Sequence, residues 1–248
     1  MRPGEVVRPG GAVRLDGASR PEGAALGRLI LALDTATTRA VVALGDAGGE
    51  LLAEDSWPAG FRHGEELLAR IDALLTARSL GLDAVAGIVA GTGPGAFTGL
   101  RVGLATAKGL AHGLGRPLVG VSTAAALLAA AARSGAPQPL ALLVPAGPSD
   151  RVLVHGATIE LLRGGTEAEL PAGTSLIAVD LEGRAPEAAV ARGVRAVAGL
   201  GRALVSIGAA RLAAGDGDDL AAVVPEYVTL PRGVREQVGE VSWSRGHR

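Results

Sequence analysis

The residues with the clearest potential for chemistry lie in one glycine-rich stretch, GTGPGAFTGLRVGLATAKGLAHGLG, at positions 91–115. Loops of this kind often bind phosphate, because the first turn of the following helix offers free N–H donors and a partial positive charge. A Walker A loop needs Lys and then Ser or Thr after its last glycine, but Leu100 follows Gly99 here. A Rossmann loop needs an acidic residue about 20 positions later, and the segment there, LAHGLGRPLVG, has none. Neither standard phosphate loop is predicted.

The alternative for this stretch is a structural loop, with glycines at positive φ and with Thr98 capping the helix. The sequence DTATT at positions 34–38 resembles the first phosphate loop of actin-like enzymes, where an Asp and hydroxyl groups meet the nucleotide and Mg²⁺. An Asp in this position is also typical of a turn, and we favour that interpretation. The residues left open as nucleotide contacts or loop residues are Asp34, Thr35, Gly93, Gly95 and Thr98.

Other kinds of catalytic site find no support in the sequence. The four histidines form no HxxxH or HExxH pair, so no zinc site and no metallopeptidase are predicted. No Ser stands in a Gly-x-Ser-x-Gly elbow, and the chain has no Cys to serve as a nucleophile or thiolate ligand. We therefore predict no catalytic residue, no metal and no cofactor.

Composition limits the class of partner. The 248 residues are 48% hydrophobic and 2% aromatic, with a formal net charge of −1. Such a chain has no electrostatic reason to bind nucleic acid alone, and it has few aromatic rings for stacking bases. No uninterrupted apolar run reaches the length of a membrane span, and the lack of Cys fits a cytoplasmic protein.

The first half of the chain must position the glycine loop. Three short strands joined by tight turns are predicted to pair antiparallel. A helix, a buried strand, the loop with its long helix, another buried strand and an alanine-rich helix capped by Ser122 then follow. These elements are expected at 28–34, 39–45, 50–56, 64–78, 84–90, 99–115, 117–121 and 122–133. This order matches the ribonuclease H-like unit that is duplicated in actin-like proteins.

The second half has weaker patterns. Strands are expected at 138–146, 151–161 and 175–183, and a helix at 201–215. We predict an α/β, actin-like (ASKHA, duplicated ribonuclease H-like) two-lobe fold with a reduced second lobe. The expected division is a disordered extension at 1–27, a first lobe at 28–133 and a degenerate second lobe with the C-terminal segment at 134–248.

The helix after the loop carries a ridge of small residues. Gly99, Gly103, Ala107, Ala111 and Gly115 recur every four positions. A glycine inside a helix costs about 0.5–1 kcal/mol relative to alanine, so the ridge indicates close packing against another backbone. That backbone is either the chain's own sheet or another subunit.

Three segments carry a family resemblance. LILALDTATTRAVVAL, GTGPGAFTGLRVGLATAKGLA and RPLVGVSTAAALLAA occur in order over residues 29 to about 130. In motif order and spacing they resemble the TsaB (YeaZ) family of bacterial tRNA threonylcarbamoyladenosine proteins. VVPEYVTLP, near the C-terminus, is similar to the family's Pro-x-Tyr-x-Arg element, although Thr229 replaces the arginine. Pro145-Ala146-Gly147 stands where the family commonly has Asp-Ala-Arg.

The resemblance implies a partner rather than a catalyst. Family members pair with the TsaD subunit, which carries the metal and transfers the threonylcarbamoyl group to tRNA adenosine, and an ATPase subunit, TsaE, completes the complex. They also self-associate through the same helical face. For this chain the resemblance implies an accessory subunit without catalytic activity alone, homodimeric by itself, that meets tRNA only through the complex and binds no membrane.

The two helices at 64–78 and 99–115 fit the partner-binding role. The residues assigned to it are Leu67, Leu68, Ile71, Leu74, Leu75, Gly99, Leu100, Gly103, Leu104, Ala107 and Ala111. We expect Gly103→Leu to abolish partner binding while the monomer stays folded. The alternative function is an actin-like kinase or ATPase for a small metabolite, for which residues 134–248 offer no second phosphate loop.

Overall fold

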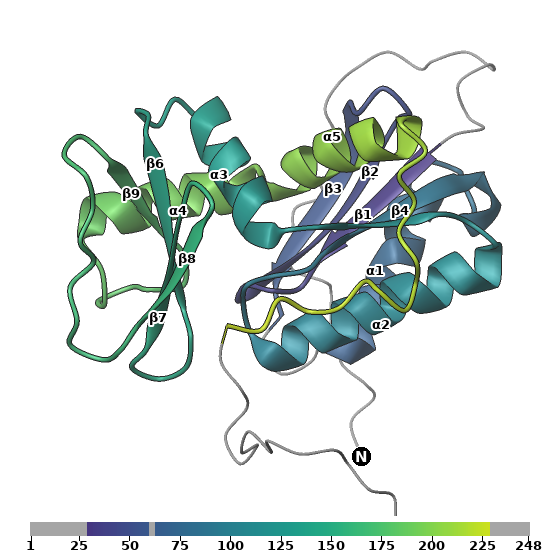
Figure 1. The fold of residues 1–248 in the computed structure, drawn as a ribbon. Coiled ribbons are helices and arrows are strands. Elements are labelled where there is room, and N and C mark those ends of the chain that lie inside the picture. The colour runs from purple at the N-terminus through teal and green to yellow at the C-terminus, as the bar shows by residue number, and fades with distance from the viewer. Residues whose placement is uncertain (1–28, 60–62, 229–248) are drawn as a thin grey trace, which may run out of the picture.

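The computed structural model describes residues 29–59 and 63–228. Two sheets lie side by side, each with helices packed against it (Figure 1). The predicted extension at 1–27 lies outside the described residues, and so does Thr229. Among the described helices, no single one is long and apolar enough to cross a membrane. The consecutive helices Glu187–Ala198 and Leu200–Ala213 pass that test only when joined across a 55° bend.

The first sheet has the strand order β3-β2-β1-β4-β5. Its strands are β1 (Leu29–Asp34), β2 (Arg39–Gly45), β3 (Leu51–Pro58), β4 (Val85–Gly91) and β5 (Leu118–Val121). The first three pair antiparallel, whereas β4 and β5 run parallel to β1, because helical crossovers connect them. The predicted meander and both parallel strands are confirmed.

Helices cover both faces of this sheet. α1 (His63–Thr76) and α2 (Phe97–Leu114) contact one face, α5 (Leu200–Ala213) contacts the other, and a short 3-10 helix, Leu82–Ala84, precedes β4. Burial on both faces explains why β1 is an unbroken apolar run. Leu31 and Leu33 pack toward α1 and α2, and Ile30 packs toward α5.

The second sheet is smaller, with the order β8-β7-β6-β9. Its strands are β6 (Leu140–Pro145), β7 (Arg151–His155), β8 (Thr158–Leu162) and β9 (Ser175–Ala178), and α3 (Thr123–Arg133) and α4 (Glu187–Ala198) pack beside it. The single strand predicted at 151–161 is wrong, because Gly156 turns the chain at φ 56° and splits it into a hairpin.

Two details of the helix ends differ from expectation. Ser122 occupies the N-cap position of α3, but its hydroxyl makes no capping bond and lies 3.2 Å from the carbonyl of Gly93. The N-cap of α2 is Ala96, so Thr98 lies inside the first turn and the predicted cap is wrong. Helix α4 had no predicted counterpart.

One apolar core joins the two sheets. Val41 and Val89 of the first sheet belong to the same buried cluster as Leu142 and Ile177 of the second, with α3 and α5 between them. The division into lobes at 133/134 stays a prediction, and α5 crosses it, since this helix from the second half covers the first sheet.

The interior glycines of α2 provide a test of this packing. A methyl group on Gly103 would lie 2.2 Å from Oγ1 of Thr35, which is held in place by its bond to Gly99, whereas a methyl group on Gly109 would meet nothing within 4 Å. We expect Gly103→Ala to lower the free energy of unfolding by about 1–3 kcal/mol. Gly109→Ala should raise it by up to about 1 kcal/mol. Urea unfolding of both variants measures this, and equal effects would contradict the assigned inward and outward faces.

Candidate functional site

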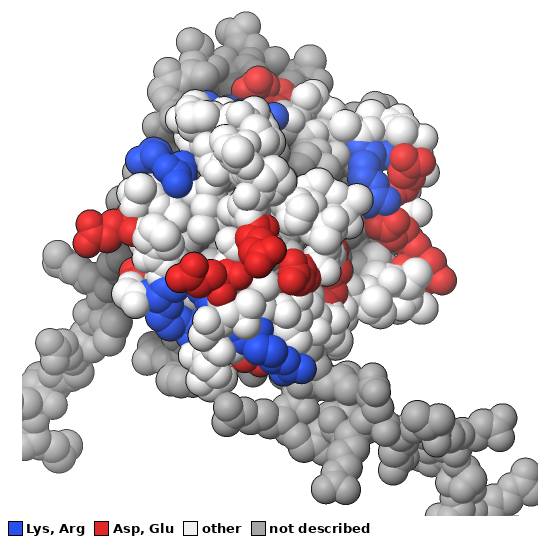
Figure 2. Space-filling view, turned by 60° about the vertical axis from the view of Figure 1, so that its left-hand side comes forward, with Lys and Arg blue, Asp and Glu red and all other residues white. Residues whose placement is uncertain are grey.

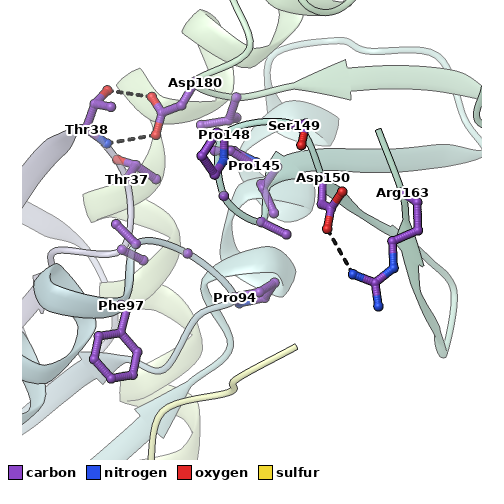
Figure 3. Close-up of a pocket in the computed structure, with 17 residues that line it drawn as sticks. Thr37, Thr38, Pro94, Phe97, Pro145, Pro148, Ser149, Asp150, Arg163 and Asp180 are labelled. Carbon is purple, nitrogen blue, oxygen red and sulfur yellow. Dashed lines mark hydrogen bonds and ion pairs between the residues drawn. The ribbon is translucent and has the colours of Figure 1, made fainter. Parts of the chain in front are cut away.

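A cleft of about 730 Å³ opens between the two lobes. Its walls are the β1–β2 turn and the glycine loop of the first lobe, and the β6–β7 turn and the residues after β9 of the second. Figure 3 shows Thr38, Pro94 and Phe97 on one side, with Ser149 and Asp150 on the other. A cleft at this place, where strands from both sheets end, is the natural candidate for a ligand site in an open α/β protein.

A hydrogen-bonded pair closes one end of the cleft. Asp180 accepts a bond from the backbone N–H of Thr38 at 2.7 Å and another from its hydroxyl at 2.5 Å (Figure 3). Asp180 has a φ of 57°, a left-handed conformation that non-glycine residues rarely adopt. Thr38, which belongs to the possible phosphate loop, is therefore already bound by the chain's own carboxylate.

Asp34 is buried at the end of β1, and each of its carboxylate oxygens accepts a hydrogen bond from the chain. Its Oδ1 accepts the N–H of Ala36 at 2.7 Å, and its Oδ2 accepts the hydroxyl of Thr123 at 2.6 Å. Thr123 in turn accepts the N–H of Gly93 at 2.9 Å. Burial raises the pKa of Asp34 to about 6, although the hydrogen bonds from Thr123 and Ala36 lower it. The arrangement is that of a turn cap rather than a magnesium ligand open to solvent.

The glycine loop packs against the β1–β2 turn. A methyl group on Gly95 would lie 2.2 Å from the carbonyl oxygen of Ala36, and that oxygen accepts the N–H of Ala96 at 2.7 Å. The hydroxyl of Thr35 is buried and donates to the carbonyl of Gly99 at 2.7 Å. Gly93 has a φ of 107°. The glycines therefore allow two loops of one chain to touch, and of the predicted loop residues only Gly95 lines the cleft.

Most of the predicted partner-binding residues face inward. Ten of the eleven are buried against the chain's own first sheet, and only Leu68 is exposed, at 56%. A residue covered by its own sheet cannot meet a partner without opening the fold. The structure argues against the expectation that Gly103→Leu leaves the monomer folded, since even a methyl group there would lie 2.2 Å from Oγ1 of Thr35.

A second small-residue ridge lies on the outer face of the same helix. Ala105, Gly109 and Gly113 are exposed and again recur every four residues. Ala69 and Ala73 of the neighbouring α1 are exposed beside Leu68. We call this set, Leu68, Ala69, Ala73, Ala105, Gly109 and Gly113, the α1–α2 face. Both ridges of α2 have the same period, so the sequence alone could not say which one meets the sheet.

No cluster of three or more His, Asp or Glu side chains in the described part of the chain could hold a metal ion. Seen from the side on which the second sheet lies, acidic side chains gather across the middle of the molecule and basic ones lie apart from each other (Figure 2). This face has no continuous basic surface of the kind that binds nucleic acid.

Comparison with known proteins agrees with this architecture. The family model "TsaD: tRNA N6-adenosine threonylcarbamoyltransferase" matches residues 58–191. The tRNA threonylcarbamoyladenosine biosynthesis protein TsaB of Escherichia coli (strain K12) is 38% identical over 94 residues, which make up 38% of this chain and 40% of that protein. TsaB of Haemophilus influenzae is 39% identical over 102 residues, or 41% and 42% of the two chains.

A solved structure extends the likeness to most of the fold. YeaZ from Pseudomonas aeruginosa is 25% identical, with a TM-score of 0.64 over 81% of this chain and 100% of that one. This agreement, with the family model, confirms the predicted actin-like fold. The aligned part of the chain spans about two fifths of the length of the curated TsaB proteins that it matches.

The buried Asp34 generates a prediction about pH. Its pKa in the folded state, about 6, lies above the ordinary value of 3.8, so the folded state binds the proton more tightly than the unfolded state. Its contribution to the free energy of unfolding is therefore complete below pH 3.8 and is lost as the pH rises through 6, by about 3 kcal/mol in total.

Asp34→Asn, which cannot titrate, isolates this contribution. Urea unfolding between pH 4 and 8 should show the wild type losing stability relative to Asp34→Asn as the pH rises. Parallel pH profiles for the two proteins would contradict the raised pKa.

Proposed function

The chain belongs to the TsaB (YeaZ) group of the TsaD family, and on that premise we propose that it is a non-catalytic subunit in threonylcarbamoyladenosine modification of tRNA. In this proposal it binds and activates a TsaD-type enzyme, works with a TsaE-type ATPase in the cytoplasm, and meets tRNA only through the complex. By itself it forms a homodimer.

The main support for this proposal comes from the exposed small residues of the α1–α2 face. Gly109 and Gly113 each lower helix stability by about 0.5–1 kcal/mol relative to alanine, and no neighbouring atom in the described chain requires them. Small residues on a helix surface let a second helix approach closely. Together with the exposed Leu68, they form a surface of small and apolar residues suited to a helical partner. We expect an interface of standard size there, about 800 Å² per subunit.

The structure around the cleft fits a non-catalytic subunit better than a kinase or an ATPase. An enzyme that closes over a nucleotide needs lobes that move, whereas one apolar core here runs through both sheets. Thr38 and Asp34, the groups that would meet phosphate and Mg²⁺, are already hydrogen-bonded within the chain itself. Asp34 is also buried and does not line the cleft, so its carboxylate is poorly placed to bind a metal there.

Gly109→Leu tests the docking face. The added side chain points into open space in the monomer, so the fold should persist, but it should hold a partner helix away and weaken binding at least 100-fold. Binding to the TsaD homologue of the same genome is measured by calorimetry and sizing chromatography, with circular dichroism to verify folding.

Ala191→Leu is the matched control, because Ala191 is also exposed on a helix but lies on α4 in the second lobe. It should bind like the wild type. Wild-type affinity of a folded Gly109→Leu would place the interface elsewhere. Absence of any complex, together with ATP turnover by the chain alone, would favour the kinase or ATPase instead.

A further inference from the structure

A cation is held in place beside the α1–α2 face, and no acidic side chain of the described residues pairs with it. The guanidinium of Arg101 stacks on the ring of Phe97, 3.8 Å from its centroid, and lies 5.8 Å from the ring of Tyr227. Its Nε–H donates to the hydroxyl of Tyr227 at 2.8 Å. The two rings are 5.1 Å apart, so the three side chains form one cluster.

The terminal nitrogens of Arg101 meet no acceptor within the described residues. Several other arginines of this chain pair with carboxylates, among them Arg70, Arg163 and Arg211. Arg101 instead has its position fixed by aromatic rings while its outer N–H groups stay available. A planar guanidinium held this way is preorganised for the two oxygens of a carboxylate, because little side-chain entropy remains to be lost on binding.

Glu226, the residue next to Tyr227 in the sequence, does not pair with Arg101. Its Oε1 accepts the hydroxyl of Thr92 at 2.5 Å and its Oε2 lies 3.2 Å from the hydroxyl of Ser122. These bonds fix the segment that carries Tyr227 and keep the negative charge away from Arg101. The cation therefore remains unneutralised by its own neighbour.

The helix itself does not require this charge. The guanidinium lies back over Phe97, the first residue of α2, where the positive end of the helix dipole disfavours a cation. Helix α2 contains no Asp or Glu, and Lys108, seven positions after Arg101, lies on the same side as Arg101 and the exposed Ala105. The outer stripe of α2 is thus small and positively charged.

We propose that Arg101, held by Phe97 and Tyr227, is a preformed carboxylate-binding site that takes an Asp or Glu side chain of the protein partner at the α1–α2 face. The identity of that partner rests on the proposed function, whereas the site itself does not. A protein carboxylate fits better than an RNA phosphate, because RNA binding depends on many basic contacts, and the exposed glycines favour a closely packed helix.

The first experiment needs no partner. The full chain is titrated with a poly-L-glutamate oligomer, and the Nε–Hε signal of Arg101 is followed by NMR. The signal should shift and saturate, poly-L-glutamine should leave it unmoved, and Tyr227→Phe should weaken the response by removing the positioning hydrogen bond. An unmoved Arg101 signal, an equal response to poly-L-glutamine, or a response to poly-uridylate alone would overturn the carboxylate site.

The second experiment measures the dissociation constant for the TsaD homologue against salt concentration. Arg101→Gln should weaken binding about 10- to 100-fold and flatten its salt dependence. Arg101→Lys should recover only part of the affinity, because the ammonium lacks the fork. Arg195→Gln, which removes an exposed charge from α4, should bind as the wild type does.

The outcomes separate the two proposals. If the wild type binds and Arg101→Gln binds equally well with the same salt dependence, the assignment of Arg101 to the partner is wrong. A loss confined to self-association of the chain would equally overturn it. If the wild type fails to bind at all, the proposed function fails, and the polyglutamate titration still decides whether Arg101 is a carboxylate site.

Discussion

The close approach of helix α2 to the β1–β2 turn is the constraint on which the rest of the first lobe depends. Three contacts hold it: the bond between Ala96 and Ala36, the bond between Thr35 and Gly99, and the glycine surface at Gly95 and Gly103, which leaves no room for side chains. They fix the rotation of α2 about its own axis. That rotation decides which small ridge meets the sheet, which one faces outward, and where Arg101 can reach.

The same contacts change the role of a loop that resembles a phosphate loop. In such a loop, backbone donors and hydroxyls stay free for the ligand. Here Asp34, Thr35 and Thr38 are each satisfied by groups of the chain, and Asp180 ties the loop to the second lobe. The β1–β2 turn, which resembles a phosphate loop in sequence, here supports helix α2. In the interaction that we propose, recognition takes place on the outside of that helix, where Gly109 and Gly113 make no packing contact within the described chain.

The order of elements in the first lobe could be predicted from the sequence, because its strands are continuous apolar runs and its helices have clear periodicity. Helix α4 could not be predicted, since small Ala and Val residues supply its apolar positions. Gly193 also interrupts its apolar pattern, at the point where the helix touches the backbone of Ala178. The residues predicted to bind a partner lie on the side of α2 that meets the sheet, and the sequence could not reveal this because both ridges repeat every four residues. The Arg101 cluster joins positions 126 residues apart, a proximity that only the fold reveals.

The path of the chain after the second sheet has a consequence for how the protein is made. Helix α5 covers one face of the first sheet (Figure 1). The segment that follows α5 in the sequence runs along the edge strand β5, where Asp218 bonds to Leu118 and Gly120. Strands β1 and β4 therefore remain uncovered on one side until α5 and the residues that follow it have been synthesised. During translation the apolar side of β1 and β4 stays open to water or to a chaperone, so the lobe that begins the protein is the one completed last.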